Sequence, residues 1–540
     1  MFSEKGGYMK KQKIRKSVET AIDNIIYEGC TDVSTFGKPF ELNLLKDQKL
    51  RKKITDDVAE KLNNIVNSNG DFETLKIKKI SHMLVPKKTF YDFRKCALID
   101  IVDEIKYLSL VLLIASDIES KRVSKTIAYS YRYKPNKNGR LFNKDYNYSS
   151  FKNEYKKISS QNKYNIIIEC DISNFYDRLN LHRLNSTLLS IPSVDSKITN
   201  TIDQLLLFWA NRDSYGLPVG SNASRILAEA FLIEIDNYLL SHKIRFCRFV
   251  DDYRFFAADV SEANKILSRF VEILNKHGLA INLKKTCMRD IKGYHTDILK
   301  TKKSKNSKNL ITPGIIVGYS GLVPTKFRQL SESEINKLQE ENIEELISNL
   351  KKDSIIEPTN VIKSIKAIVA QNKHGLLCEF PDILKKYPQF IPYFSDVIFK
   401  NKEFITKEDY NKILDKLYLW LKVDDTPEYI LISIVKMFDA KNEDEKNKLF
   451  DYFKNLKRNS GVYLARTILE QIGNNLTRGE LLELKDYFLR ADNWEKRQMV
   501  NMFLNGLSYQ ENRPFLKDLK INCDDYFIET MAEKNEKKKR

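Results

Sequence analysis

A chain of 540 residues is too long for a single hydrophobic core, so roughly two to four domains are expected. Hydrophobic residues make up 42% of the chain and aromatic residues 11%, which excludes a disordered polypeptide and indicates a globular protein. The formal net charge of +19 is typical of proteins that bind nucleic acid or another polyanion, and also of a solubilising Lys-rich surface.

The seven cysteines are scattered without a C-x-x-C pair, and the six histidines make no metal-ligand spacing with them. This pattern argues against a disulfide framework or a zinc site and fits a reducing cytosol. The N-terminus lacks the apolar segment that a signal peptide requires. The longest apolar stretch, residues 107–115, is too short to span a membrane and predicts a buried helix. We therefore expect a cytoplasmic protein with no membrane partner.

Residues 10–157 have a mixed pattern that predicts mainly helices. The pattern changes at residues 165–280, where an apolar run of strand type leads through a helical stretch and a glycine-marked loop to a long amphipathic helix, about 222–240. Two short apolar runs then flank Asp251 and Asp252, which predicts a β-hairpin with a carboxylate pair at its tip. A second helix follows the hairpin. A sheet with two covering helices is an α+β layer.

The polar, basic residues 301–308 predict an exposed loop or linker, or a segment that contacts phosphates. After about residue 329 the pattern is helical almost to the end. Short linkers between roughly paired helices predict an α-solenoid of HEAT-like type, and an irregular helical bundle is the alternative. The charged tail, residues 533–540, is expected to be disordered. The expected helices cover residues 407–421, 428–437, 443–456, 462–472, 481–489 and 494–504.

Three carboxylates lie at the ends of predicted strands. Asp171 closes the apolar run 166–170, and Asp251 and Asp252 lie at the hairpin tip. Phosphoryl transfer from a nucleoside triphosphate uses two divalent metals about 3.5–4 Å apart, which prefer carboxylate oxygens on rigid elements. A strand end beside a hairpin tip meets this requirement. The plainer alternatives are that Asp171 caps the next helix and that the hairpin is an ordinary surface turn.

The segment 171–177 (DISNFYD) resembles motif A of reverse transcriptases, in which an Asp is followed five positions later by a bulky aromatic residue. The resemblance implies that Asp171, with the adjacent Ile172, belongs to a metal site. It also implies that Phe175 and Tyr176 bind the nucleotide, Tyr176 being the steric gate that excludes a ribose 2′-OH. A ring in that space would clash with the extra oxygen, so Tyr176 favours DNA synthesis.

The segment 216–221 (GLPVGS) is similar to motif B, whose glycines allow close approach to a nucleotide or a nucleic-acid strand. By this resemblance Gly220, Ser221 and Arg225 bind the nucleotide. The usual motif has Gln between the Pro and the Gly, where this chain has Val219, a departure that weighs against ordinary templated copying. The alternative is a loop that only begins the following helix.

The hairpin residues 249–252 (FVDD) resemble motif C, usually Tyr-x-Asp-Asp. This implies that Asp251 is a catalytic metal ligand and that Asp252 supports the metal site. The segment 278–286 (GLAINLKKT) is similar to motif D, and its Lys285 matches the catalytic lysine that protonates or neutralises the departing pyrophosphate. An ordinary solvated lysine is the alternative. The four segments follow one another in the family's order.

Arginines in the fingers of reverse transcriptases clasp the triphosphate of the incoming nucleotide, and a guanidinium group suits phosphate geometry. Arg132, ahead of the predicted palm, is the first candidate for this role. Arg94, earlier on a stretch that we expect to be helical, is the second. For each of them an ordinary surface or salt-bridge residue is the alternative.

Residues 224–229 (SRILAE) and the long helical C-terminal region, with 492–497 (DNWEKR) near its end, resemble the abortive-infection and defence-associated reverse transcriptases of bacteria. The resemblance implies an α+β right-hand polymerase, with fingers and palm, followed by an all-α HEAT-like repeat domain. The implied domains are an N-terminal helical region with fingers, a palm, a basic connector, a helical repeat domain and a charged tail, at residues 1–160, 161–300, 301–330, 331–532 and 533–540.

The implied function is that of a reverse-transcriptase-like DNA polymerase, an RNA-directed DNA polymerase by class, that uses dNTPs and two Mg²⁺ ions, with Mn²⁺ as the alternative ion. Its implied role is antiphage defence by abortive infection, as a homo-oligomer that makes DNA without a template from a protein hydroxyl. None of the 27 tyrosines is singled out as that hydroxyl. The alternatives are synthesis templated by a dedicated non-coding RNA, an RNA-synthesising polymerase or primase, and a catalytically idle palm that serves as an RNA-binding scaffold.

Overall fold

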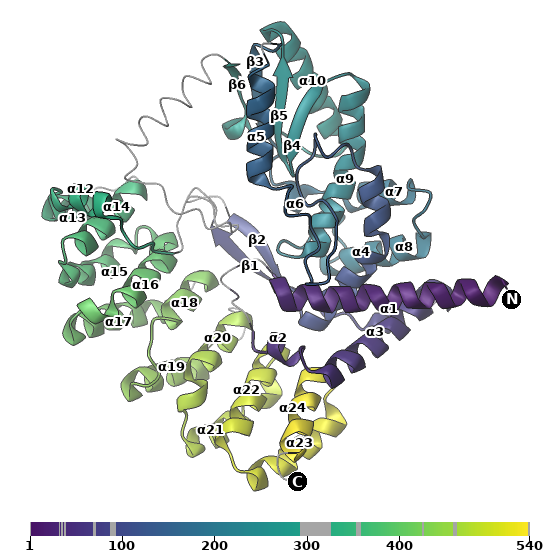
Figure 1. Cartoon of the computed structure of the whole chain (residues 1–540). Coiled ribbons are helices and arrows are strands. Elements are labelled where there is room, and N and C mark those ends of the chain that lie inside the picture. Colours follow the sequence, from purple (N-terminus) through teal and green to yellow (C-terminus); the bar gives the residue numbers. More distant parts are fainter. Residues whose placement is uncertain are drawn as a thin grey trace. The chain divides into compact units, whose positions relative to one another are not determined.

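The computed structural model of the chain (Figure 1) describes residues 2–31, 33, 36, 39–68, 72–86, 93–161, 163–291, 326–352, 358–423, 426–456 and 462–537. These residues form two compact units. The first unit falls within Met1–Asp32, Lys38–Ile80 and Ala97–Asn306. The second unit falls within Val33–Gly37, Ser81–Cys96 and Ser307–Arg540. Residues 301–308, expected to form an exposed loop, lie outside the described part of the chain.

A four-stranded sheet forms the centre of the first unit. Its order is β4-β5-β3-β6, and each neighbouring pair is antiparallel. The predicted strand before Asp171 and the predicted hairpin are both confirmed, as β3 and as β4 with β5. β6 was not predicted, because its sequence is short and partly polar and it becomes a strand by pairing with β3. The strands are β3 (Ile166–Asp171), β4 (Arg245–Phe249), β5 (Asp252–Ala257) and β6 (Cys287–Asp290).

Helices surround this sheet. The described α-helices of the first unit are α1 (Phe2–Glu28), α2 (Glu41–Leu44), α3 (Gln48–Ser68), α4 (Ile101–Lys121), α5 (Tyr148–Ser159), α6 (Phe175–Arg178), α7 (Leu181–Leu189), α8 (Ser196–Trp209), α9 (Asn222–Ser241) and α10 (Val260–Lys276). The two helices expected around the hairpin are confirmed as α9 and α10. The apolar stretch 107–115 lies within α4 and is buried throughout, as predicted.

Side chains of β5 alternate between the two faces of the sheet. Tyr253 and Phe255 lie on one face, with their rings 4.8 and 4.9 Å from the ring of Phe270 on α10. Arg254 lies on the other face, with its guanidinium 5.7 Å from the ring centre of Phe151 on α5. The strands accordingly lie between α5 and α10 (Figure 1). By the same alternation Asp252 lies on the face that α5 covers.

Most of a two-stranded sheet that the sequence did not predict belongs to the second unit. It is formed by β1 (Ser81–Pro86) and β2 (Phe93–Leu98), and β1 packs against α18 (Glu428–Val435). The expectation of a helical stretch around Arg94 was therefore wrong, since this residue lies on β2. Several residues of β2 favour helices on their own, and pairing with β1 overrides that preference.

The rest of the described second unit is helical, as predicted. Its α-helices are α12 (Glu332–Gln339), α13 (Ile343–Lys352), α14 (Pro358–Ala370), α15 (Phe380–Ile383), α16 (Ile391–Lys400), α17 (Lys407–Leu421), α18, α19 (Glu443–Asn455), α20 (Val462–Ile472), α21 (Arg478–Lys485), α22 (Asn493–Gly506), α23 (Tyr509–Asn522) and α24 (Tyr526–Lys537). The contacts between helices follow a regular pattern. α16, α18, α20, α22 and α24 pack in succession, while α17, α19, α21 and α23 each pack against the next member of that series.

The C-terminal tail differs from the prediction. Disorder was expected from residue 533, but α24 continues to Lys537, and residues 538–540 lie outside the described chain. Phe527, Ile528 and Met531 are buried, and α24 packs against α22 and α23. This apolar anchor lets the helix run on into a charged sequence.

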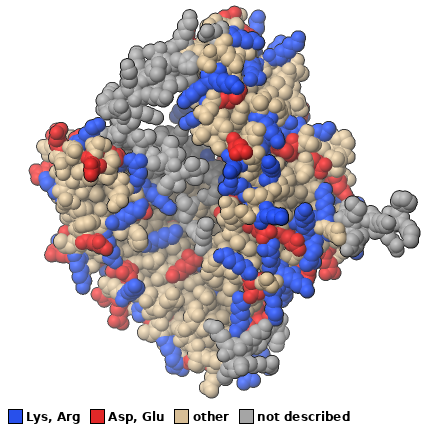
Figure 2. All heavy atoms as spheres, in the orientation of Figure 1, with Lys and Arg blue, Asp and Glu red and all other residues tan. Residues whose placement is uncertain are grey.

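Charged side chains are spread widely over the molecule. Figure 2 shows Lys and Arg across the visible face with Asp and Glu between them, as a net charge of +19 leads one to expect. Among the helices that the structure describes, none is both long and apolar enough to cross a membrane.

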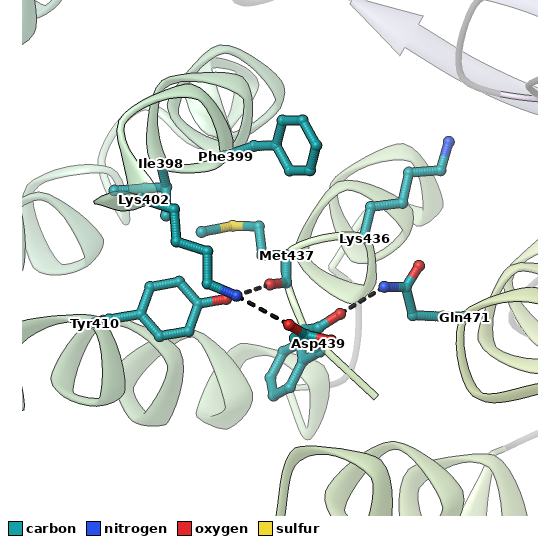
Figure 3. A pocket seen from close by; sticks show the side chains of 9 residues that line it. Ile398, Phe399, Lys402, Tyr410, Lys436, Met437, Asp439 and Gln471 are labelled. Carbon is teal, nitrogen blue, oxygen red and sulfur yellow. Dashed lines mark hydrogen bonds and ion pairs between the residues drawn. The ribbon is translucent and has the colours of Figure 1, made fainter. Parts of the chain in front are cut away.

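A cavity of about 190 Å³ lies in the second unit, among α16, α17, α20 and the turn that follows α18 (Figure 3). Its side chains join neighbouring helices. The Tyr410 hydroxyl donates to the carbonyl of Met437 at 2.7 Å, and Lys402 forms an ion pair with Asp439 at 3.1 Å. The side-chain amide of Gln471 donates to the carbonyl of Phe438, in the same turn as Met437. The cavity wall thus ties successive helices of the array to each other.

Candidate active site

The β4–β5 hairpin turns at Val250 and Asp251, because Phe249 and Asp252 already face each other in the ladder. Val250 has a φ of +55°, a left-handed conformation that is rare for a β-branched residue. The carbonyl of Asp251 accepts a hydrogen bond of 3.1 Å from the N–H of Ile172, whose side chain is buried. This bond joins the hairpin tip to the segment that follows β3, so the carboxylates of the two predicted segments come together.

The charge of Asp171 acts on both carboxyl groups of the hairpin tip. Burial and the nearby charge of Asp171 raise the pKa of Asp251 to about 7. Burial also raises the pKa of Asp252, although its ion pair with Arg254 opposes the change. The charge of Asp171 therefore repels a second negative charge at Asp251. A hard divalent cation relieves this repulsion and prefers carboxylate oxygens, so Asp171 and Asp251 fit Mg²⁺ as a donor set.

A lysine and an asparagine hold Asp171. Lys285 Nζ lies 3.0 and 2.9 Å from the two carboxylate oxygens of Asp171. The side-chain amide of Asn282 donates to the same carboxylate at 3.1 Å, and its main-chain N–H donates to the Asp171 carbonyl at 2.7 Å. Lys285 is half exposed at the end of the short helix η3 (Leu283–Lys285). Asn282 was given no role from the sequence, although its place three residues before the lysine was a usable signal.

The carboxylates do not all point the same way. Asp171 and Asp251 would hold a cation, while the Asp252 carboxylate turns to Arg254 and to the Tyr148 hydroxyl, 3.5 Å away. Within the described residues, no group of three or more metal-ligating side chains is preformed. Divalent ions bound here would lower the pKa of an attacking hydroxyl and neutralise a leaving pyrophosphate.

The predicted steric gate and the glycine-marked loop are structurally joined. Tyr176 lies half-buried on α6, and its carbonyl accepts a hydrogen bond of 2.9 Å from the N–H of Leu217. Phe175 is buried, with its ring 6.2 Å from the ring of Phe231 on α9. Gly216 has a φ of +97°, which side chains disfavour, and this lets the loop turn beside α6. The ring of Tyr176 is thereby placed by main-chain contacts.

The other predicted nucleotide contacts of this loop hold the start of α9. The buried Ser221 hydroxyl caps that helix and donates to Glu104 Oε1 at 2.6 Å. Gly220 is buried, with a φ of +122°. The Arg225 guanidinium lies 5.0 Å from the ring centre of Tyr131. For Ser221 to contact a nucleotide, its hydroxyl would have to leave Glu104.

The two predicted triphosphate arginines belong to different units of the chain. Arg132 is only 2% exposed, and its guanidinium donates to three main-chain carbonyls at 2.6–2.8 Å and pairs with Glu119 at 3.2 Å. Burial lowers the pKa of Arg132. The structure therefore uses Arg132 as a buried salt-bridge residue, the alternative that the sequence left open. Arg94 lies on β2 in the second unit, whereas the three carboxylates belong to the first unit.

Tyr148 and Arg254 are site residues that the sequence did not reveal. Tyr148 is 42% exposed at the start of α5, with its ring 5.4 Å from that of Phe249 and its hydroxyl beside Asp252. Arg254 pairs with Asp252 and lies 3.4 Å from Glu169. Nothing local distinguishes Tyr148 among 27 tyrosines. The alternation of β5 was a usable signal for Arg254, since a residue two positions after Asp252 shares its face.

Comparison with solved structures gives low similarities. They include the telomerase of Candida albicans in complex with a fragment of telomeric RNA (12% identity, TM-score 0.29, 73% of this chain and 66% of that chain). They also include the apo telomerase of Candida tropicalis (12% identity, TM-score 0.30, 76% and 68%) and its complex with such an RNA fragment (15% identity, TM-score 0.28, 67% and 64%). The alignments thus span about two thirds of each telomerase chain, and similarity this low supports no inference. No curated protein gives a significant match.

A family model is more informative. Residues 118–310 match the model described as reverse transcriptase (RNA-dependent DNA polymerase). This range contains Asp171, Asp251 and Lys285, which the structure brings together. This part of the chain is therefore a reverse transcriptase domain, the kind of domain that RNA-directed DNA polymerases use.

Proposed function

We propose that the chain is a reverse-transcriptase-like DNA polymerase that uses dNTPs by a two-metal mechanism. One observation carries the proposal: Asp171 and Asp251 lie close enough for the charge of one to raise the pKa of the other, and Lys285 contacts Asp171. A repulsive carboxylate pair is costly in a protein that only binds nucleic acid, and it is useful to one that binds divalent cations.

In the proposed reaction a hydroxyl oxygen attacks the α-phosphorus of a dNTP. The new P–O bond forms as the bond to pyrophosphate breaks, and the hydroxyl proton passes to solvent. Lys285 protonates or neutralises the pyrophosphate, the role that the family resemblance implies for it. Tyr176, fixed by the bond from Leu217, closes the space that a ribose 2′-OH would need.

Incorporation of labelled dNTPs tests this proposal. The purified protein should incorporate dNTPs with Mg²⁺ or Mn²⁺, either alone or on an added RNA template with a DNA primer. Asp171→Ala should abolish incorporation at unchanged folding, and Asp145→Ala, an exposed aspartate of the same unit, should leave it intact. Equal incorporation by wild type and Asp171→Ala would refute the proposal.

We further propose that synthesis is protein-primed and untemplated. Val219, in place of the usual Gln, supports the lack of a template. Tyr148 supports priming, because its exposed hydroxyl lies 3.5 Å from Asp252 and adjoins the site where a primer hydroxyl must act. Replacement of a primer 3′-OH by a tyrosine hydroxyl would give a phosphotyrosyl-linked DNA. Synthesis templated by a dedicated non-coding RNA is the alternative.

The priming proposal is tested by the nature of the product. A protein-linked product changes mobility after proteinase treatment, and ribonuclease treatment before the reaction separates untemplated synthesis from copying of a copurified RNA. Tyr148→Phe should lose the protein-linked product and still extend an added DNA primer. Tyr27→Phe, another exposed tyrosine of the first unit, is the matched control. Protein-linked DNA from Tyr148→Phe at the wild-type level would assign priming to another residue.

The resemblance to defence-associated enzymes also supports a cytoplasmic antiphage role and a homo-oligomer. For the second unit we propose a HEAT-like repeat array, supported by the regular contacts of α16, α18, α20, α22 and α24. The domain assignment with fingers before a palm at 161–300 belongs to the same proposal. Phage plating on cells that express wild type or Asp171→Ala tests the defence role, and light scattering of the purified protein tests the oligomer.

A further inference from the structure

A buried polar cluster lies behind the catalytic hairpin. Its members come from the end of α4, the segment after it, α9 and β4, and all are between 0 and 8% exposed. We call this set the hairpin brace; it consists of Arg122, Ser130, Glu229, Asp236 and Arg248. Buried charges are expensive unless they are fully paired, so a cluster of four charged side chains here calls for an explanation.

The charges of the brace are paired. Arg248 bonds to both carboxylate oxygens of Asp236 at 2.7–2.9 Å and lies 2.9 Å from Glu229. Arg122 pairs with Glu229 at 2.5 Å and also donates to the carbonyl of Ser130 at 2.7 Å. The Tyr253 hydroxyl donates to Asp236 at 3.1 Å. Two arginines and two carboxylates thus cancel in charge and form a rigid support.

The brace reaches the hairpin tip through Ser130. The segment before it runs beside β4, with the N–H of Tyr129 donating to the carbonyl of Arg248 at 3.0 Å and Ala128 bridged to Arg248. This places the Ser130 hydroxyl against the turn. There it donates to Glu229 and accepts a hydrogen bond of 2.9 Å from the N–H of Val250.

Val250 is the strained residue of the turn, with a φ of +55°. A side chain branched at Cβ disfavours this conformation, so the turn relies on outside contacts to keep it. Ser130 fixes the N–H of Val250, and Arg248 lies 3.4 Å from its carbonyl oxygen. Both main-chain polar groups of Val250 are therefore held, and the next residue in the chain is Asp251.

We propose that Ser130 and Arg248 are positioning residues that hold Val250 in its left-handed conformation and so direct the Asp251 carboxylate toward Asp171. The effect on catalysis rests on the proposed function of Asp251. Without the brace the turn relaxes toward negative φ at Val250, and Asp251 swings away. A displacement of this kind, of the order of 1 Å, costs about 100-fold in rate.

The test compares Ser130→Ala in the wild-type and Val250→Gly backgrounds. In the wild-type background Ser130→Ala should lower kcat about 10- to 100-fold, with KM for dNTP changed less than about twofold. Glycine adopts positive φ without strain, so in the Val250→Gly background the same substitution should cost less than about threefold. Ser109→Ala, a buried serine of α4 whose hydroxyl bonds within its own helix, should have no effect.

Hydrogen exchange of the peptide that contains residues 249–252 gives a readout independent of activity. Ser130→Ala should accelerate exchange there, and Ser109→Ala should not. Unchanged exchange, or an equal kcat loss in both backgrounds, overturns the proposal. If Ser130→Ala does not fold, Val250→Pro is the alternative variant, because proline cannot adopt a φ of +55°. A wild-type kcat in Val250→Pro overturns the proposal. If the wild-type protein has no polymerase activity, the proposed function is refuted. The comparison of hydrogen exchange then tests by itself whether the hairpin brace holds the turn at Val250.

Discussion

Glu104 offers a stability prediction with a defined dependence on pH. It lies on α4, only 2% exposed, and its Oε1 accepts the hydroxyl of Ser221 at 2.6 Å. Burial raises its pKa from an ordinary value of 4.5 to about 8, although the bond from Ser221 and the charge of Arg225 oppose the change. The folded protein therefore keeps a proton on Glu104 at neutral pH, while the unfolded chain has released it.

The sign and size of the effect follow from these two pKa values. Between about 4.5 and 8 the folded state holds one more proton than the unfolded state, so the free energy of unfolding falls as pH rises. Each pH unit in this window is worth about 1.4 kcal/mol, which gives a loss of about 5 kcal/mol above pH 8. Glu104→Gln keeps the shape of the side chain and removes the titration. The variant should gain nothing at pH 4 and up to about 5 kcal/mol at pH 9.

Urea unfolding, followed by circular dichroism at pH 5 and at pH 9 for wild type and Glu104→Gln, measures this difference. The transition of the first unit should move to higher urea in the variant at pH 9 and much less at pH 5. Glu60→Gln, an exposed glutamate of α3, is the control and should behave as wild type at both values. An equal change at both pH values, or a less stable variant at pH 9, would show that the folded protein does not keep a proton on Glu104 at neutral pH.

Three further predictions concern the site and its support. Lys285→Met should lower the Mg²⁺ concentration needed for half-maximal activity, because Asp171 loses its ion pair. It should also reduce kcat by about 100-fold if the lysine acts as a general acid. Steady-state kinetics at several Mg²⁺ concentrations separate the two effects, and an unchanged kcat would show that Lys285 is only an ion-pair residue. Tyr176→Ala should reduce the preference for dNTPs over NTPs by about 10-fold or more, as measured by the ratio of kcat/KM values; an unchanged ratio would remove Tyr176 as the gate. Gly139→Ala should destabilise the first unit by roughly 2–5 kcal/mol, because Gly139 has a φ of +84° and a Cβ there would lie 2.4 Å from the carbonyl oxygen of Asp23; thermal unfolding checks this, and a wild-type melting temperature would contradict it.

The parts of the fold that local patterns decide could be predicted from the sequence. The strand before Asp171 and the hairpin around Asp251 are marked by apolar runs with a carboxylate at a turn. Helices with a clear apolar stripe were also found, α17 and α20 at their observed bounds. In each case a single segment contains both the residues that form the element and the signals that end it.

The rest depends on contacts between distant segments. The sequence around Arg94 favours a helix, but pairing with β1 makes it part of strand β2. The sequence also suggests that Arg132 binds phosphate, but in the folded chain three main-chain carbonyls and Glu119 surround its guanidinium. The bond between Ser130 and Val250 joins residues 120 positions apart. No local pattern carries such information, because it arises when the sheet and α9 assemble.

Incorporation of dNTPs by wild type and Asp251→Asn, an isosteric change that leaves the hairpin intact, tests whether Asp251 is a catalytic metal ligand. Each protein would be assayed with Mg²⁺, both without added nucleic acid and with an RNA template and a DNA primer. We expect incorporation by wild type in at least one condition and a loss of about 1,000-fold or more in Asp251→Asn, with unchanged circular dichroism and unfolding. Incorporation that survives the substitution would show that Asp251 is not a catalytic metal ligand, and no incorporation by wild type in either condition would show that the protein is not a DNA polymerase.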